Sequence, residues 1–360
     1  MTDAATPERL SPDEALHLLV EGDLPDLGRR ADAVARRLHP GPCRTYAIDR
    51  NINFSNLCEC RCRFCAFWRA RGDPEAYVLD DETLFAKIEE AVRLGATHIL
   101  GQGGLSPQTD LAYYEALLPR IKARFDILLH CFSPPEIHYM AEAAGLPVRT
   151  VLERLRAAGL DSLPGGGAEI LVDRVRSLVS PNKCTAEEWI AAMRAAHSLG
   201  MPTSATMVFG HVETPAERIE HLARLRDLQD ETGGFLSFIA WPFQAPNTVL
   251  AASGDLGPEW RPVGGAEYLR LVAVARIFLD NFPNVQASWV TMGPKIGQVA
   301  LAFGANDLGS TMIEENVVAA TGRVHRATPQ MLRWLIEAAG YQPRQRNSRY
   351  QTVSPRPIKG

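Results

Sequence analysis

Four of the seven cysteines of this 360-residue chain lie within eight positions, from Cys58 to Cys65. Cys58, Cys62 and Cys65 are separated by three and two residues, so one loop can bring three thiols to several corners of an iron-sulfur cube. Structural zinc sites and electron-transfer clusters usually close with a fourth protein ligand, whereas three ligands leave one metal open. We therefore predict a metal site on Cys58, Cys62 and Cys65 that can still bind a substrate or cofactor.

Cys60 complicates this interpretation because it creates an alternative C-x-C-x-C spacing within the same loop. A structural zinc site is the alternative that this spacing leaves open. We expect Cys60 to be a bystander, and the three thiols at Cys58, Cys62 and Cys65 to be the ligands.

The elements that position this loop are strands and helices in alternation, which indicates βα units around a parallel sheet. The cysteine loop directly follows the first of eight candidate strands, at the strand end where barrel enzymes build active sites. The eight segments are Thr45–Asn51, His98–Gly101, Ile127–Cys131, Ala168–Leu171, Thr203–Phe209, Phe235–Ala240, Val285–Trp289 and Val299–Phe303. We predict an α/β protein with a (βα)8 TIM-type barrel.

Three regions are expected along the chain. Residues 1–43 form an N-terminal helical segment that caps the barrel, residues 44–325 form the barrel, and residues 326–360 form a short extension with a helix and a mobile tail. Capping boxes at Thr185–Glu188 and Thr214–Glu217 predict two helix starts. Gly95 and Gly200 follow periodic apolar stretches and predict helix ends.

The C-x3-C-x2-C spacing, with the aromatic Phe64 before the last cysteine, resembles the signature of the radical S-adenosylmethionine (SAM) superfamily. The resemblance implies a 4Fe-4S cluster that binds SAM and cleaves it reductively to methionine and a 5'-deoxyadenosyl radical. It also implies an external one-electron reductant of the flavodoxin or ferredoxin type. In such an enzyme the cofactor supplies the chemistry, and the barrel positions and shields it.

Candidate SAM-binding residues lie at the ends of predicted strands. Gly103 and Gly104 resemble the glycines of the superfamily's GGE motif, although Leu105 stands at its third position. Ser133 closes the third strand, and the resemblance suggests that Glu169 contacts SAM. A salt bridge from Glu169 to Arg174 or Arg176 is the structural alternative. Either arginine could instead hold the methionine carboxylate, and we favour Arg176.

Candidate catalytic residues follow the fifth and eighth strands. His211 and Glu213 come just before the Thr214 cap, where Glu213 can equally serve the helix N-terminus. The run from 303 to 316 is dense in hydrogen-bonding groups, and Asn306, Asp307 and the Glu314-Glu315 pair are the first to test. We consider His211, Glu213 and Glu314 as candidate bases, without a choice among them.

Over about residues 44–325 the chain resembles the menaquinone (futalosine pathway) branch of the superfamily. The segments that carry this resemblance are Asp49–Phe54, Arg63–Phe67, Ala168–Arg176, Ser180–Lys183, Met207–Thr214, Ala287–Val290 and Gly304–Asp307. The branch implies a small nucleoside-type substrate, hydrogen abstraction at ribose C4' and a new C–C bond to a benzoate ring.

Three alternatives stay open. One is a sister enzyme, of the aminofutalosine synthase kind, that transfers the adenosyl radical to an enolpyruvyl benzoate. The second is an enzyme like the deazaflavin (F0) synthases, and the third is a non-catalytic metal-binding scaffold.

Composition limits the partners. With 38 Lys and Arg against 42 Asp and Glu, the net charge is −4, which does not favour nucleic acid as a partner. We identify neither a secretory leader nor an apolar run of the roughly 20 residues that a membrane span needs. Scattered cysteines outside the cluster fit a reducing compartment, so we expect a cytoplasmic protein.

Overall fold

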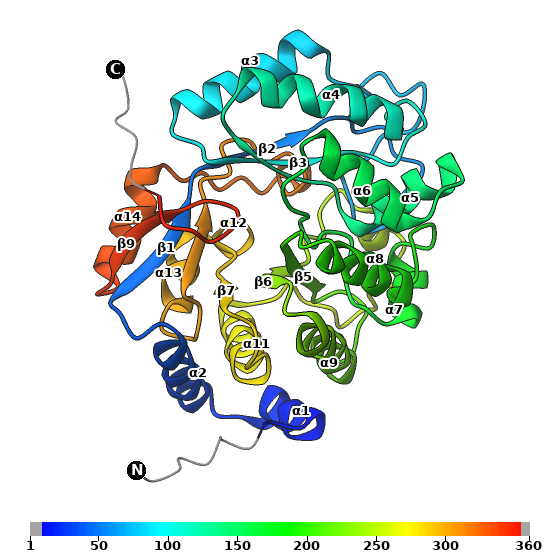
Figure 1. Ribbon diagram of the computed structural model, residues 1–360. Helices are drawn as coiled ribbons and strands as arrows, with labels where there is room; N and C mark the ends of the chain where they lie inside the picture. Colours follow the sequence, from blue (N-terminus) through cyan, green and yellow to red (C-terminus); the bar gives the residue numbers. More distant parts are fainter. Residues whose placement is uncertain (1–8, 354–360) are drawn as a thin grey trace.

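A computed structural model describes residues 9–353 of the chain. Parallel strands surround a central space, and helices form an outer layer (Figure 1). The strands of the described residues are β1 (Cys43–Ala47), β2 (Asp49–Asn53), β3 (His98–Gln102), β4 (Leu128–Cys131), β5 (Thr203–Phe209), β6 (Phe235–Pro242), β7 (Asn284–Gln286), β8 (Asp307–Ser310) and β9 (Gln342–Arg346).

The strands pair in two parallel sheets, in the orders β5-β6-β7-β8-β1-β9 and β2-β3-β4. On one side β1 runs into β2 with only Ile48 between them. On the other side single bridges join Ser162 to His130 of β4 and Leu163 to Thr203 of β5. The two sheets therefore close into one barrel with eight strand positions, and the predicted (βα)8 fold is confirmed.

Helices follow most of the strands and cover the outside of the barrel (Figure 1). The hydrophobic core lies between the two layers. The helices are α1 (Pro12–Glu21), α2 (Leu24–Leu38), α3 (Asp81–Arg93), α4 (Leu111–Arg124), α5 (Pro134–Ala144), α6 (Val148–Ala158), α7 (Asp173–Val179), α8 (Ala186–Ser198), α9 (Pro215–Thr232), α10 (Val249–Ala252), α11 (Gly265–Phe278), α12 (Trp289–Met292), α13 (Pro294–Ala300) and α14 (Pro329–Ala338), with a 3-10 turn η1 (Ala319–Thr321).

The chemical signals for helix ends are confirmed. Thr185 and Thr214 each form a complete capping box, at the starts of α8 and α9. Gly95 and Gly200 adopt φ values of +89° and +70°, the left-handed conformation that glycine tolerates best. In the predicted N-terminal segment, α1 packs against α9 and α11, and α2 packs against α11.

Two of the eight predicted strands were wrong. Ala168–Leu171 forms no strand; the fourth position of the barrel is held by the bridge residues Ser162 and Leu163 instead. Val299–Phe303 lies at the end of α13 and the following turn, and the eighth strand is β8, Asp307–Ser310. Both errors have the same cause. The true strand positions carry polar residues, Ser162 and Asp307–Ser310, whose hydrogen bonds only the tertiary structure reveals, so a nearby apolar segment was chosen each time.

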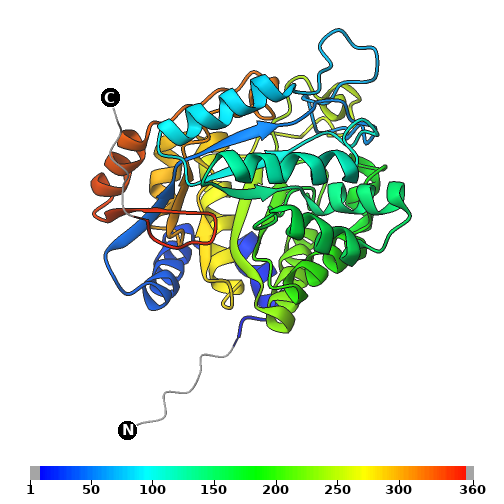
Figure 2. The ribbon, with the colours of Figure 1, turned by 45° about the horizontal axis from the view of Figure 1, so that its top comes forward.

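The prediction of a mobile tail is also wrong for residues 342–353. β9 pairs in parallel with β1 from Cys43–Gln342 to Ala47–Arg346 (Figure 2). Arg346 is buried and bonds Asp307 of β8 through two guanidinium nitrogens. This buried ion pair anchors a basic, proline-bearing segment whose composition alone predicts an exposed end.

Among residues 9–353, no helix has both the length and the apolar character that a membrane span requires.

Candidate active site

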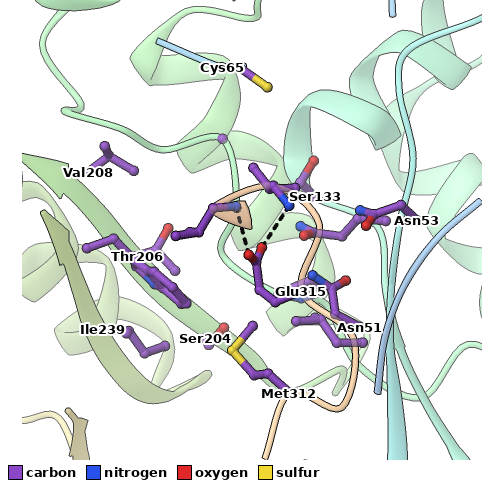
Figure 3. A pocket seen from close by; sticks show the side chains of 18 of the residues that line it. Asn51, Asn53, Cys65, Ser133, Ser204, Thr206, Val208, Ile239, Met312 and Glu315 are labelled. Carbon is purple, nitrogen blue, oxygen red and sulfur yellow. Dashed lines mark hydrogen bonds between the residues drawn. The ribbon is translucent and has the colours of Figure 1, made fainter. Parts of the chain in front are cut away.

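A cavity of about 380 Å³ occupies the barrel interior and extends to the cysteine loop. Figure 3 shows part of its lining, with Cys65 at one end of the view, Met312 at the other and Glu315 between them. The predicted site residues that line it are Cys58, Cys62, Cys65, Gly103, Gly104, Ser133 and Glu169. The structure thus brings together the predicted cluster ligands and four of the five predicted SAM-binding residues.

The cysteine loop is held in place by backbone hydrogen bonds to distant segments. Cys58 N donates to Arg69 O at 3.1 Å, and Arg63 N donates to Val179 O at 2.8 Å. Cys60 is buried but does not line the cavity, and its thiol donates to Asn182 O at 3.1 Å. This geometry fits the prediction that Cys60 is a bystander.

The environment of the thiols favours thiolate at two of the three positions. Contact with the neighbouring Cys60 thiol lowers the pKa of Cys58 to about 6 and also lowers the pKa of Cys62. Burial raises the pKa of Cys65 to about 11. Metal ligation requires deprotonated thiols, so the loop is already biased toward the ligand form at Cys58 and Cys62.

The three thiols supply the donors that an iron-sulfur cluster needs. Cys58, Cys62 and Cys65 line one cavity, so their thiolates can ligate three corners of an iron-sulfur cube. The donor set therefore matches a 4Fe-4S cluster with one corner left for a cofactor.

The glycine loop after β3 packs directly on the cysteine loop. A Cβ at Gly104 would lie 1.9 Å from Leu57 O, so only glycine allows this approach. Leu105 N donates to Cys58 Sγ at 3.4 Å, and Leu105 O accepts from Glu59 N at 2.8 Å. Leu105, which replaces the motif's glutamate, thus contributes its backbone to the cluster loop.

Glu136 is a cavity residue that the sequence analysis missed. It is buried at the start of α5 and accepts hydrogen bonds from Gly103 N at 2.9 Å and from Ser133 N and Oγ, both at 2.7 Å. Burial raises its pKa to about 7. The signal was present, since Ser133-Pro-Pro-Glu136 is a capping box, but the burial of its carboxylate depends on the barrel.

Glu169 is paired, but neither with Arg174 nor with Arg176. Its Oε1 lies 2.5 Å from Lys183 Nζ, and both side chains line the cavity. Burial disfavours the charged lysine, but Cys62 and Glu169 raise its pKa well above the ordinary value. Glu169 also adopts φ +43°, a rare conformation for a residue with a side chain and one that collects at functional sites.

Arg176 is placed away from the cavity. Every guanidinium nitrogen donates to a backbone carbonyl, those of Gly167, Ala168 and Cys184. The side chain is buried and organises the turn that carries Glu169. We therefore correct the prediction that Arg176 holds the SAM carboxylate.

His211 and Glu213 are likewise outside the cavity lining. Glu213 accepts from Gly210 N, His211 N and Arg218 Nε within 2.9 Å, and His211 Nε2 contacts Val208 O at 3.0 Å. Burial opposes ionisation of Glu213, but His211 and Arg218 lower its pKa far below the usual range. Their role is to fold the turn before α9, which corrects their prediction as candidate bases.

The neighbouring residues Glu314 and Glu315 differ in their surroundings, because only Glu315 lines the cavity. Glu314 bonds Lys87 Nζ at 2.6 Å and Arg50 Nε at 2.9 Å and does not line the cavity. Glu315 lines it, and accepts from the backbone N–H groups of residues 317–319. Burial raises the pKa of Glu315. Glu315 therefore replaces Glu314 as the candidate base.

Two other residues singled out in the run after Gly304 are structural. Asn306 accepts from Arg276 Nη2 at 2.7 Å, and Asp307 pairs with Arg346. Neither lines the cavity, whereas Trp241, Gln244 and His130, at the ends of other strands, do.

Two solved structures share the fold of this chain. The FeFe-hydrogenase maturase HydG from Carboxydothermus hydrogenoformans matches 95% of this chain and 78% of its own, with a TM-score of 0.74 and 16% identity. Methylornithine synthase (PylB) matches 94% of this chain and 95% of its own, with a TM-score of 0.72 and 17% identity. At these identities the likeness concerns the fold alone.

Sequence relatives are far more similar. The model of the radical SAM superfamily matches residues 52–225, and that of the CofH/MqnC C-terminal region matches residues 232–358. The fold, the three-thiol cavity and these matches define a radical SAM enzyme that uses a 4Fe-4S cluster and SAM.

Curated relatives narrow the class. Proteins named cyclic dehypoxanthine futalosine synthase, from Halalkalibacterium halodurans and Streptomyces coelicolor, are 47% and 42% identical over 97% of this chain and 93% and 86% of their own. A Methanopyrus kandleri protein named 5-amino-6-(D-ribitylamino)uracil–L-tyrosine 4-hydroxyphenyl transferase is 39% identical, over 97% of this chain and 98% of its own. The chain belongs to the cyclic dehypoxanthine futalosine synthase and CofH/MqnC family of radical SAM enzymes.

Proposed function

We propose that this chain converts dehypoxanthine futalosine into cyclic dehypoxanthine futalosine, a step in menaquinone biosynthesis. The observation that carries the proposal is a barrel cavity lined by three cluster thiols in a chain 47% identical, almost end to end, to a relative named for this reaction. The reaction removes one hydrogen atom from ribose C4', joins C4' to the benzoate ring, and then removes one electron and one proton from the ring, so that SAM is consumed as the net two-electron oxidant.

In this proposal Cys58, Cys62 and Cys65 hold the cluster, and Gly103, Gly104, Ser133 and Glu169 contact SAM. Bound to the reduced cluster, SAM supplies a 5'-deoxyadenosyl radical as the hydrogen acceptor. Gly104 lets the backbone approach closely, and Lys183 fixes Glu169 beside the cluster loop. The chain's own contribution is to hold the reacting atoms close together and to exclude water.

A base must take the proton that leaves the ring, and we assign that role to Glu315. Its carboxylate lines the cavity, and its raised pKa makes it a stronger base than an exposed glutamate. The three backbone N–H groups that bond it also fix its position.

The experiment is anaerobic incubation of the reconstituted protein with SAM, dithionite and dehypoxanthine futalosine, followed by mass analysis. We expect a product two hydrogens lighter than the substrate and one 5'-deoxyadenosine per product. A parallel incubation with an enolpyruvyl benzoate tests the sister transferase, and a product that contains the adenosyl group would overturn our proposal.

A second candidate function has a specific observation in its favour, because a relative named for 4-hydroxyphenyl transfer is 39% identical over 97% of this chain. Incubation with tyrosine and 5-amino-6-(D-ribitylamino)uracil tests it. Conversion of that pair, with the futalosine substrate unchanged, would overturn our proposal.

The electron for SAM cleavage requires a donor, for which we propose a flavodoxin- or ferredoxin-type protein. We also propose a cytoplasmic location, since low-potential clusters need a reducing compartment.

A further inference from the structure

The end of the cavity opposite the cysteine loop is closed by the C-terminal segment. β9 pairs with β1, the first half of the strand whose second half, β2, leads to the cysteine loop. Arg346, Ser348 and Tyr350 of this segment line the cavity, together with Asn51 from β2. We call Asn51, Arg346 and Ser348 the cavity floor.

The floor contains polar atoms without partners. Asn51 Oδ1 and Ser348 Oγ are buried and make no hydrogen bond within the described residues. A buried polar atom without a partner costs about 1–3 kcal/mol, so two such atoms beside one cavity indicate a polar guest. The inner positions of other barrels usually carry branched apolar side chains that fill the space.

The floor also carries a buried guanidinium, whose charge the carboxylate of Asp307 balances. Arg346 is buried, and Asp307 bonds its Nε and Nη2 from behind, since Asp307 itself does not line the cavity. Nη1 has two hydrogens and makes one hydrogen bond, to Asn347 O at 3.2 Å. Arg346 therefore presents to the cavity a guanidinium that keeps one N–H without a partner among the described residues.

The carboxylates that line the cavity already have their own donors. Glu169 pairs with Lys183, Glu136 accepts from Ser133 and Gly103, and Glu315 accepts from three backbone groups. Two of them, Glu136 and Glu169, lie with the glycine and cysteine loops at the cluster end. An anionic group of a ligand is therefore disfavoured near the cluster, where Glu136 and Glu169 lie.

We propose that the cavity floor binds the benzoate carboxylate of the substrate and so directs the sugar toward the cysteine loop. This assignment rests on the proposed function, whose substrate carries its negative charge on the benzoate. Asn51 takes part by presenting its amide nitrogen, which rotation about the last side-chain bond allows. Arg346 and Ser348 supply the other donors.

The first test compares the substrate with its carboxamide analogue, which has the same shape and no charge. Loss of charge-assisted hydrogen bonds is worth about 10–100-fold in binding, so we expect the wild type to show a KM for the carboxamide higher by about that factor. Equal KM values for the two compounds would overturn the assignment.

The second test introduces a negative charge at either of two positions on β2. Asn51→Asp places a carboxylate at the floor and should reduce the preference for the natural substrate over the carboxamide by about 10-fold or more. Asn53→Asp is the matched control, two residues closer to the cysteine loop, and should keep the preference. Dithionite-driven SAM cleavage without substrate reports that each variant still holds its cluster.

The third test separates this assignment from the proposed function. Calorimetric titration of 3-acetylbenzoate and 3-acetylbenzamide into the reconstituted protein requires no turnover. If Asn51→Asp weakens 3-acetylbenzoate binding and Asn53→Asp does not, the carboxylate assignment is supported even when the futalosine substrate is not converted. If the substrate is converted normally and Asn51→Asp leaves the affinity for 3-acetylbenzoate unchanged, the carboxylate assignment is wrong and the proposed function is unaffected. If Asn51→Asp does not fold, Ser348→Ala replaces it in this test. We expect Ser348→Ala to lower the affinity for 3-acetylbenzoate by about 3–10-fold, and an unchanged affinity would contradict the assignment.

Discussion

Lys183 Nζ lies 2.5 Å from Glu169 Oε1; Glu169 is buried, Lys183 is partly buried, and both act on the thiol of Cys62. The two residues are 14 positions apart in the chain; Glu169 precedes α7 and Lys183 follows it. Their pairing fixes a glutamate with a left-handed backbone at the edge of the cluster loop. The pair also places one positive charge next to thiols that must ionise to bind iron.

Lys183→Met should destabilise the protein by about 3–5 kcal/mol, because it leaves the carboxylate of Glu169 buried without a counter-charge. Urea denaturation of the cluster-free protein under reducing conditions measures this change. The double variant Lys183→Met, Glu169→Gln should recover a large part of the loss. A change below 1 kcal/mol in the single variant would show that the pair is not required for folding.

Cys58→Ala, Cys62→Ala and Cys65→Ala should each abolish SAM cleavage, because each removes one of three cluster ligands. Cys60→Ala is the matched control and should keep cleavage, since its thiol bonds Asn182 O and does not line the cavity. The measurement is 5'-deoxyadenosine release after anaerobic reconstitution, with iron content as a second readout. Retained cleavage in any of the first three variants would refute the ligand assignment.

Glu315→Gln should lower the rate of product formation by about 100- to 10,000-fold, the usual effect of losing a general base. Since burial raises the pKa of Glu315, wild-type turnover should fall as the pH drops through that raised value, and the variant should lose this dependence. Glu314→Gln is the control, because Glu314 faces Lys87 and Arg50 outside the cavity. Equal turnover in the two variants would exclude Glu315 as the base.

Glu136 should make the folded protein less stable as the pH rises. Its pKa is raised by burial from 4.5 to about 7, so the folded state binds a proton more tightly than the unfolded state between these values. The free energy of unfolding should therefore fall from pH 4.5 to pH 7, by about 3 kcal/mol relative to Glu136→Gln. Urea denaturation of both proteins across this range gives the difference, and parallel pH profiles would contradict the raised pKa.

The sequence by itself determined the chemistry and the class of fold. The spacing of Cys58, Cys62 and Cys65 predicted the metal site, because one short loop carries all three thiols, and the three line one cavity. Capping boxes and the alternation of strands and helices identified the barrel, because both signals are local. Gly103 and Gly104 were predicted because they follow the second predicted strand, Ser133 because it follows the third, and Glu169 through the family resemblance; all four line the cavity.

Only the tertiary structure decided which polar residues face the cavity. The sequence places several polar residues near the ends of predicted strands. Those that form turns or ion pairs outside the cavity are His211, Glu213, Arg176 and Glu314. Those that line the cavity include Glu136, Lys183 and Glu315. The sequence did not predict β8 and β9, because the charged residues Asp307 and Arg346 are buried as an ion pair between positions 39 residues apart in the chain. The physical reason is the same throughout, since burial of a charge is acceptable only with a partner, and the partner is chosen by the fold.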